Sequence, residues 1–158
     1  MHIIGISGSP RGRRSETRRL VEKVLEGARA AGAEVEFVDL GDVRIDYCVA
    51  CDSCHITGTC SRDDEFEPLR EKLLAADGLV LGSPLYFNSV TAQLKTMIDR
   101  LAEIIHCQLF LGKYACSVCV SGGEEHDVGT SYMNDLLLPR NQADIAVVTS
   151  GLAGFGAR

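Results

Sequence analysis

The sequence predicts a single α/β domain in which helices cover both faces of a doubly wound, five-stranded parallel sheet. Short apolar runs alternate with amphipathic helical patterns along the chain, as in parallel sheets with crossover helices. Polar loops follow three of the predicted strands, at the sheet edge where such folds bind ligands. The predicted strands are residues 2–7, 35–40, 78–83, 114–121 and 144–150.

Four helices are expected between these strands. The first runs from Ser15 with apolar residues three and four positions apart, and Gly32 ends it. The others are expected over residues 64–76, 90–105 and 127–138. No repeat or linker interrupts the pattern, so residues 1–158 are interpreted as one domain. The chain stops eight residues after the last predicted strand. We therefore expect the closing C-terminal helix of this architecture to be missing, either because the chain is truncated or because a partner subunit completes the fold and covers the sheet.

Composition and charge narrow the function classes. The chain has 158 residues, of which 46% are hydrophobic and 24% charged, as in soluble globular proteins. No apolar run approaches the ~20 residues of a membrane helix, and the N-terminus lacks a signal peptide, so we expect a cytoplasmic protein. The net charge of −6 disfavours nucleic acid as a partner. Six basic residues nevertheless cluster, which suggests a small anionic ligand or a solvated helix face: Arg11, Arg13, Arg14, Arg18, Arg19 and Lys23.

The segment 8–17, Gly-Ser-Pro-Arg-Gly-Arg-Arg-Ser-Glu-Thr, joins the first strand to the first helix. N–H groups at a helix N-terminus, with nearby hydroxyls and a guanidinium, make a natural phosphate site. The Walker spacing is absent, which disfavours a nucleoside triphosphatase, and the Gly-x-Gly-x-x-Gly pattern is also missing. A serine-capped helix after a polar turn is the alternative.

Two further loops follow the third and fourth strands. Residues 83–89 combine apolar and aromatic side chains with an asparagine and two serines, which suits a flat heteroaromatic ring with polar edges. In residues 121–124, glycines allow the backbone to approach a ligand closely.

The Gly-Ser-Pro-Arg motif, the Ser-x-Thr that follows it and the segment 83–100 resemble the flavodoxin-like NAD(P)H-dependent FMN reductase superfamily. The resemblance implies an FMN whose phosphate is held by Ser9, Arg11, Ser15 and Thr17. It places the isoalloxazine ring against Pro84, Leu85, Tyr86, Phe87 and Asn88, with Ser121, Gly122 and Gly123 on the other side. Relatives often carry Asn where this chain has Glu16, so we expect that carboxylate to point away from the phosphate.

Four cysteines occur within a loop at residues 48–60: Cys48, Cys51, Cys54 and Cys60. In a reducing compartment such a cluster more often holds a metal than a disulfide. Zinc sites usually pair two Cys-x2-Cys units across a longer spacer. Three cysteines in steps of three, with a fourth close by, favour one 4Fe–4S cluster, and Gly58 supplies the turn toward the fourth. Zinc and metal-free thiols stay open as alternatives.

This cysteine spacing in an FMN-reductase-like chain resembles the iron–sulfur flavoprotein family. The family implies a 4Fe–4S cluster on these four cysteines, an FMN in each subunit, and homodimers or homotetramers in which a cluster passes electrons to a neighbouring flavin. The remaining cysteines, Cys107, Cys116 and Cys119, are interpreted as ordinary residues. Positions 116 and 119 face opposite sides of a strand, so one metal cannot easily bind both, and both are expected to be buried.

We therefore expect an FMN-dependent oxidoreductase. In the first hypothesis it passes electrons from a ferredoxin-like donor through the cluster to FMN and on to oxygen, peroxide or a quinone. The cofactors do this chemistry, so no side chain need act as an acid or base. The second hypothesis is an NAD(P)H-dependent FMN or quinone reductase without a functional cluster. A third is a zinc-stabilised binding module without flavin, against which the intact ligand loops argue.

Overall fold

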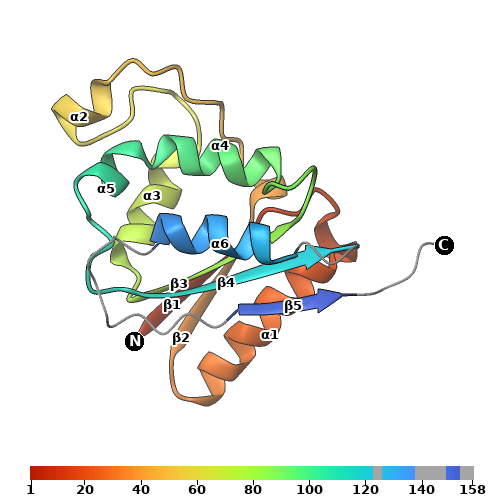
Figure 1. Ribbon diagram of the computed structural model, residues 1–158. Helices are drawn as coiled ribbons and strands as arrows, with labels where there is room; N and C mark the ends of the chain where they lie inside the picture. The colour runs from red at the N-terminus through yellow and green to blue at the C-terminus, as the bar shows by residue number, and fades with distance from the viewer. Residues whose placement is uncertain (123–125, 138–148, 154–158) are drawn as a thin grey trace.

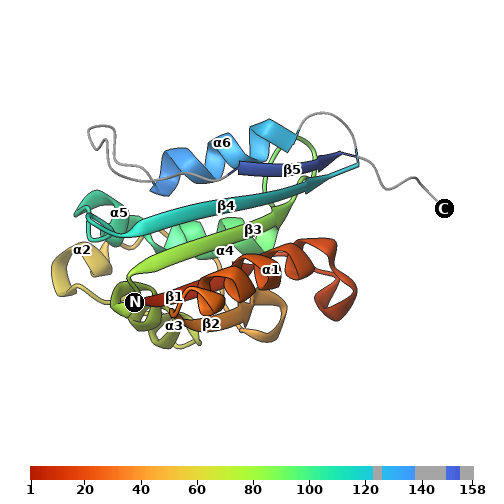
Figure 2. The same cartoon turned by 90° about the horizontal axis from the view of Figure 1, so that it is seen from below.

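The computed structural model describes residues 1–122, 126–137 and 149–153, which form three layers around a parallel sheet. Helix α1 covers one face, and α3, α4 and α6 cover the other (Figures 1 and 2). The strands are β1 (His2–Ser7), β2 (Glu34–Asp39), β3 (Gly78–Pro84), β4 (Tyr114–Ser121) and β5 (Thr149–Ala153). The helices are η1 (Gly12–Arg14), α1 (Glu16–Ala30), η2 (Leu40–Asp42), α2 (Ser53–Thr57), α3 (Phe66–Ala75), α4 (Ala92–Arg100), α5 (Ala102–His106) and α6 (His126–Leu137).

The strand order confirms the predicted doubly wound topology. Four parallel strands lie in the order β2-β1-β3-β4, and β5 extends the sheet beside β4. β1 is an interior strand, because Ile4 pairs with Glu36 on one side and with Leu79 on the other. All strands run the same way, so the loops after β1, β3 and β4 emerge at one edge of the sheet.

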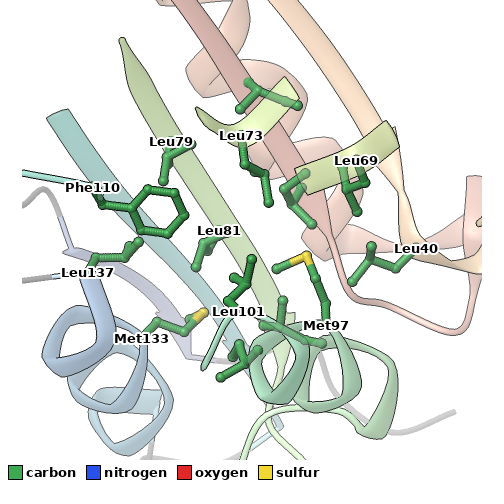
Figure 3. Packing of buried hydrophobic residues seen from close by; sticks show 14 of the residues in the cluster. Leu40, Leu69, Leu73, Leu79, Leu81, Met97, Leu101, Phe110, Met133 and Leu137 are labelled. Carbon is green, nitrogen blue, oxygen red and sulfur yellow. The ribbon is translucent and has the colours of Figure 1, made fainter. Parts of the chain in front are cut away.

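Two apolar cores fill the space on either side of the sheet. The larger core lies between the sheet and helices α3, α4 and α6, where Leu81, Met97 and Met133 meet (Figure 3). The smaller core lies under α1 and includes Val21 and Val80. Burial of both faces explains why the strands read as nearly continuous apolar runs.

Helix α1 packs unusually close to the sheet because glycines face it. A Cβ atom on Gly82 would overlap Cγ2 of Val21, and one on Gly5 would lie 2.8 Å from Cγ1 of the same valine. The start of the helix is therefore held directly against β1 and β3.

Several predicted boundaries differ from the structure. The helix expected over 90–105 is two helices, because the N–H of Leu101 donates to Ile98 O, three residues back, and this tight turn separates α4 from α5. The predicted C-terminal end of the last strand, residue 150, is wrong, because β5 continues to Ala153. Residues 144–148 lie outside the described residues, as does any segment that could form a closing helix after Ala153. No helix in the described ranges is both long and apolar enough to span a membrane.

Candidate functional site

The segment between β1 and α1 gathers hydroxyl groups around a helix N-terminus. Ser9, Ser15 and Thr17 are all buried, and the Ser15 hydroxyl caps α1 by accepting the N–H of Arg18 at 3.1 Å. The other N–H groups of a first helical turn have no acceptor within the helix. Hydroxyls beside such N–H groups are suited to binding a phosphate.

Gly8 and Thr91 fix this loop to the neighbouring strand and helix. The N–H of Gly8 donates to Gly82 O at 2.8 Å, and the Thr91 hydroxyl donates to Gly8 O at 2.6 Å. Thr91 also caps α4, because its hydroxyl accepts the N–H of Leu94. A Cβ atom on Gly8 would lie 2.8 Å from the Cβ of Leu94, so a side chain here would force the two segments apart. The loop is therefore anchored to both β3 and α4.

The predicted basic cluster divides into paired and unpaired side chains. Arg18 and Arg19 form ion pairs with acidic residues of their own helix, and the Arg19 partner, at 2.7 Å, is Glu16. The Glu16 carboxylate thus pairs with an arginine of its own helix, and its direction relative to a bound phosphate stays a prediction. The arginines of the loop itself are not buried and have no ion-pair partner among the described residues: Arg11, Arg13 and Arg14. These cations, the hydroxyls and the helix N–H groups fit the phosphate of FMN.

The segment after β3 forms a tight turn with aromatic side chains. Tyr86 and Ser89 exchange backbone hydrogen bonds of 2.9 and 3.1 Å, and Phe87 and Asn88 between them have φ of +50° and +58°. The side chain of Phe87 is fully exposed. Non-glycine residues in the left-handed region persist where surrounding structure imposes them, and they concentrate at ligand sites. The turn offers an aromatic surface at the same sheet edge as the phosphate loop.

The loop after β3, residues 83–89, and the loop after β4, which begins at Ser121, are adjacent. The N–H of Leu85 donates to Val120 O at 2.8 Å, and Pro84 pairs with Val120 in the sheet, so the turn lies beside the end of β4, where Ser121 and Gly122 follow. Gly123 lies outside the described residues. The described members of the predicted FMN set thus lie together at the carboxyl ends of β1, β3 and β4.

The cysteine loop crosses the outer side of α4 and α5, away from the sheet (Figure 1). Gly58, with φ of +74°, ends α2 and turns the chain back, in agreement with the prediction. Ala50 and Asp52 also have positive φ, of 51° and 56°. A single cavity of about 140 Å³ is lined by all four predicted ligands: Cys48, Cys51, Cys54 and Cys60.

The four thiols do not share one electrostatic environment. The backbone N–H of Ser53 and then the hydroxyl of Ser61, 3.6 Å from Sγ, lower the pKa of Cys51. Burial raises the pKa of Cys54, and the charge of Cys60 raises it further. The second effect is the repulsion expected between thiolates that lie close together.

A buried ion pair closes the base of the cysteine loop. Arg100 donates to both carboxylate oxygens of Asp64, at 2.7 and 3.1 Å, and the two side chains are 1% and 0% exposed. Arg100 also donates to Asp46 O, while Asp64 accepts the N–H groups of Asp46 and Phe66. Burial alone would raise the pKa of Asp64, but these donors outweigh it and lower that pKa to about 2. Residues 46 and 64, which flank the cysteines, are held together.

Two cations line the cavity beside the thiols. Arg62 and Arg100 each have a buried Nε–H with no acceptor, and no other described side chain has a buried polar atom in this state. A buried donor without an acceptor is rare in proteins and calls for a partner. Four thiols and two guanidinium groups fit an anionic, thiolate-bound group such as a 4Fe–4S cluster.

The arrangement of ligands also bears on which metal group fits. Among the described residues, no three His, Cys, Asp or Glu side chains converge as one metal ion would require. A zinc ion draws its ligands to a single point, whereas a 4Fe–4S cluster spreads four thiolates around a larger body. Four cysteines that line one cavity are the number of thiolate ligands that a 4Fe–4S cluster uses.

The remaining cysteines lie elsewhere. Cys119 is fully buried in the larger core, and Cys116 packs on the opposite face against the smaller core. Burial raises the pKa of both thiols, that of Cys119 to about 11. Cys107, which caps the end of α5, is exposed.

The sequence profile of the NADPH-dependent FMN reductase family matches residues 1–151. The chain belongs to this family. Its members are FMN-dependent oxidoreductases that use NAD(P)H, so family membership confirms the resemblance predicted from the phosphate loop and the segment 83–100.

Two relatives of this FMN reductase chain are named iron–sulfur flavoproteins. The relative from Archaeoglobus fulgidus is 34% identical over 138 residues, which is 87% of this chain and 62% of the relative. The relative from Methanocaldococcus jannaschii is 42% identical over 100 residues, 63% of this chain and 51% of the relative. The chain thus spans about half to three fifths of the length of these curated relatives.

A solved structure supports the fold. RosB with bound 8-demethyl-8-formylriboflavin-5'-phosphate matches with a TM-score of 0.76 at 19% identity, over 100% of this chain and 67% of RosB. The fold of this FMN reductase family member is therefore flavodoxin-like.

Sequence reasoning missed four residues that organise the two sites. Thr91 had a detectable signal, because a threonine just before an amphipathic segment is a typical helix cap. Arg62, Asp64 and Arg100 had none. A lone arginine at a helix C-terminus ordinarily interacts with the helix dipole in solvent, and its partner Asp64 lies 36 positions away.

Proposed function

We propose that this chain is an electron-transfer flavoprotein that holds an FMN and a 4Fe–4S cluster. It would carry electrons from a ferredoxin-like donor to a small oxidant such as oxygen, peroxide or a quinone. The observation that carries the proposal is the single cavity lined by four cysteines and by two arginines with unpartnered Nε–H groups. The names of the two relatives support it.

Each set of residues has a defined part. Ser9, Arg11, Ser15 and Thr17 would bind the FMN phosphate, and the turn at Tyr86–Asn88, with Pro84, Leu85 and the loop at Ser121–Gly123, would hold the ring. Cys48, Cys51, Cys54 and Cys60 would bind the cluster. When bound, the cluster supplies one-electron transfer and FMN exchanges one or two electrons. The side chains bind and orient these groups and need not transfer protons.

Partners and assembly follow from the same proposal. The donor is a ferredoxin-like protein or NAD(P)H, the acceptor is a small molecule, and neither nucleic acid nor a membrane is involved. We propose a homodimer or homotetramer in the cytoplasm, where reduced thiols are available for a cluster.

The test is an assay of iron, sulfide and flavin on one anaerobically reconstituted sample. We expect about four iron and four sulfide per FMN, as for one cluster held by four cysteines. Cys54→Ser should lose most of the iron, whereas Cys107→Ser, which changes an exposed cysteine that does not line the cavity, should keep it. Flavin without iron in the unmodified protein would refute the cluster.

A second function is favoured by the family itself. An NAD(P)H-dependent FMN or quinone reductase would need the phosphate and ring loops but no one-electron centre. In that case NAD(P)H would reduce the bound flavin at full rate in Cys54→Ser. Under the first proposal, the same substitution abolishes flavin reduction by a one-electron donor such as reduced ferredoxin.

A further inference from the structure

Two buried N–H groups of residues that line the cysteine cavity have no hydrogen-bond acceptor in the folded chain. The Nε–H groups of Arg62 and Arg100 are buried without acceptors, although both guanidinium groups donate hydrogen bonds through their Nη atoms. Both residues line the cavity together with the four cysteines.

The two guanidinium groups are held in place from outside the cavity. Arg100 donates through both Nη atoms to Asp64 and lies 4.5 Å over the ring of Phe66. Arg62 donates from Nη2 to Asp46 at 3.0 Å and lies 5.4 Å over the ring of Tyr47. Neither group can rotate to satisfy its Nε–H without breaking these contacts. Both guanidinium groups therefore stay in the wall of the cavity, with their Nε–H groups unpaired.

The cavity lining holds two basic and two acidic side chains. Arg62 and Arg100 lie in it with Asp52 and Asp99, and Asp99 pairs with Lys95. Arg100 also interacts with the thiolate of Cys60, through its charge and through a side-chain hydrogen bond.

We propose that Arg62 and Arg100 donate Nε–H hydrogen bonds to sulfur atoms of the 4Fe–4S cluster and raise its reduction potential. This inference rests on the proposed function. Uptake of one electron adds one negative charge and neither makes nor breaks a bond. Two nearby cations and two N–H···S bonds stabilise the more negative form preferentially, so removing them lowers the potential.

The experiment is a potentiometric titration of the anaerobically reconstituted protein, followed by the paramagnetic signal of the reduced cluster. Arg62→Gln is the main variant, because this side chain is 27% exposed and can be replaced with less risk to folding than Arg100. We expect the ratio of reduced to oxidised cluster at a fixed potential to fall about tenfold, which is about 59 mV for a one-electron couple. Arg62→Lys keeps the charge but lacks the Nε–H group, so the ratio of reduced to oxidised cluster should fall by less in this variant.

Two matched control variants distinguish a direct effect of the arginines on the reduction potential of the cluster from an effect of a disturbed loop structure. Arg44→Gln makes the same charge change on an exposed residue near the loop that does not line the cavity, and should leave the potential unchanged. Asp46→Asn breaks the same Arg62 ion pair but removes a negative charge. Its potential should not fall, so a fall confined to the arginine variants distinguishes cluster contact from loss of the ion pair.

The outcomes are distinct. If Arg62→Gln loses the cluster, the reduction potential is measured instead in Arg62→Lys and in Arg100→Lys, and each is compared with that of the unmodified protein. Iron-loaded arginine variants with the same potential as Arg44→Gln would overturn this inference and leave the proposed function intact. Unmodified protein without iron or sulfide would overturn the proposed cluster and this inference together, and the metal assay detects that outcome before any titration.

Discussion

The phosphate loop and the cysteine loop reach their shapes by different means. The phosphate loop is part of the sheet edge: Gly8 bonds to β3, and hydroxyls at the start of α1 supply the polar groups. The cysteine loop lies outside the helix layer and contains residues such as Ala50 with positive φ. Its base is held by the buried Asp64–Arg100 pair.

The difference shows which interactions each site depends on. The phosphate loop needs little beyond correct folding of β1, β3 and α1. The cysteine loop depends on charged contacts between distant segments, the Arg100–Asp64 and Arg62–Asp46 pairs, together with whatever occupies the cavity. Substitutions should therefore affect the two sites unequally.

The largest effect is expected from Asp64→Ala, which leaves Arg100 buried without its partner. Removing one member of a buried pair costs about 3–5 kcal/mol of unfolding free energy. Urea unfolding measures it. Glu26→Gln, which breaks the exposed pair with Lys23, should cost under about 1 kcal/mol. Equal costs for the two variants would mean that the buried pair does not hold the loop.

The same carboxylate should make stability depend on acid pH. The folded pKa of Asp64, about 2, lies below its ordinary value of 3.8, so the folded state favours the ionised form. This stabilisation is present above about pH 4 and is lost as pH falls toward 2, in total about 2 kcal/mol. Urea unfolding at several pH values should show this loss in the unmodified protein, and a smaller loss in Asp64→Asn. Parallel pH profiles would contradict the assignment.

In the phosphate loop, Thr17→Val should weaken FMN binding without unfolding the chain. Valine keeps the shape of the buried threonine but removes a hydroxyl, and a hydrogen bond to a charged group is worth about 1.5–3 kcal/mol, or roughly tenfold or more in Kd. Flavin fluorescence titration measures this loss. Ser15→Ala should also weaken binding, and in addition cost about 1 kcal/mol of stability because the α1 cap is lost. Unchanged affinity for FMN in both variants would show that the phosphate does not bind at this loop.

The smallest effect is expected from Ala50→Gly. Ala50 has φ of +51°, which costs an L-residue about 1–2 kcal/mol, and glycine avoids much of that cost while losing more entropy on folding. Stability measured by thermal unfolding should rise slightly or stay the same. The same change at Ala28 within α1 should lower stability by about 1 kcal/mol. A clear loss at both positions would show that Ala50 is not strained.

Patterns that are local in sequence were predictable. The apolar runs at 2–7 and 114–121 match β1 and β4 at both ends, and the spacing of the four cysteines anticipated that they line one cavity. The break at Leu101 was not visible, because this buried leucine continues the helical period on both sides.

Contacts between distant segments were not predictable. The partner of Arg100 depends on how the cysteine loop folds back over α4, and one sequence carries no record of that pairing. The orphaned Nε–H groups likewise emerge only when the burial of every donor is known.

Helix α4 connects the two sites directly. Thr91 at its start bonds to the phosphate loop, and Arg100 at its end lines the cysteine cavity. The helix from Ala92 to Arg100 is about 14 Å long at 1.5 Å per residue, and each added residue would turn its end by about 100°. A single insertion would therefore leave Thr91 in place but swing Arg100 out of the cavity. Both the length and the phase of α4 are fixed from its two ends, so this helix acts as a rigid spacer between the two candidate sites.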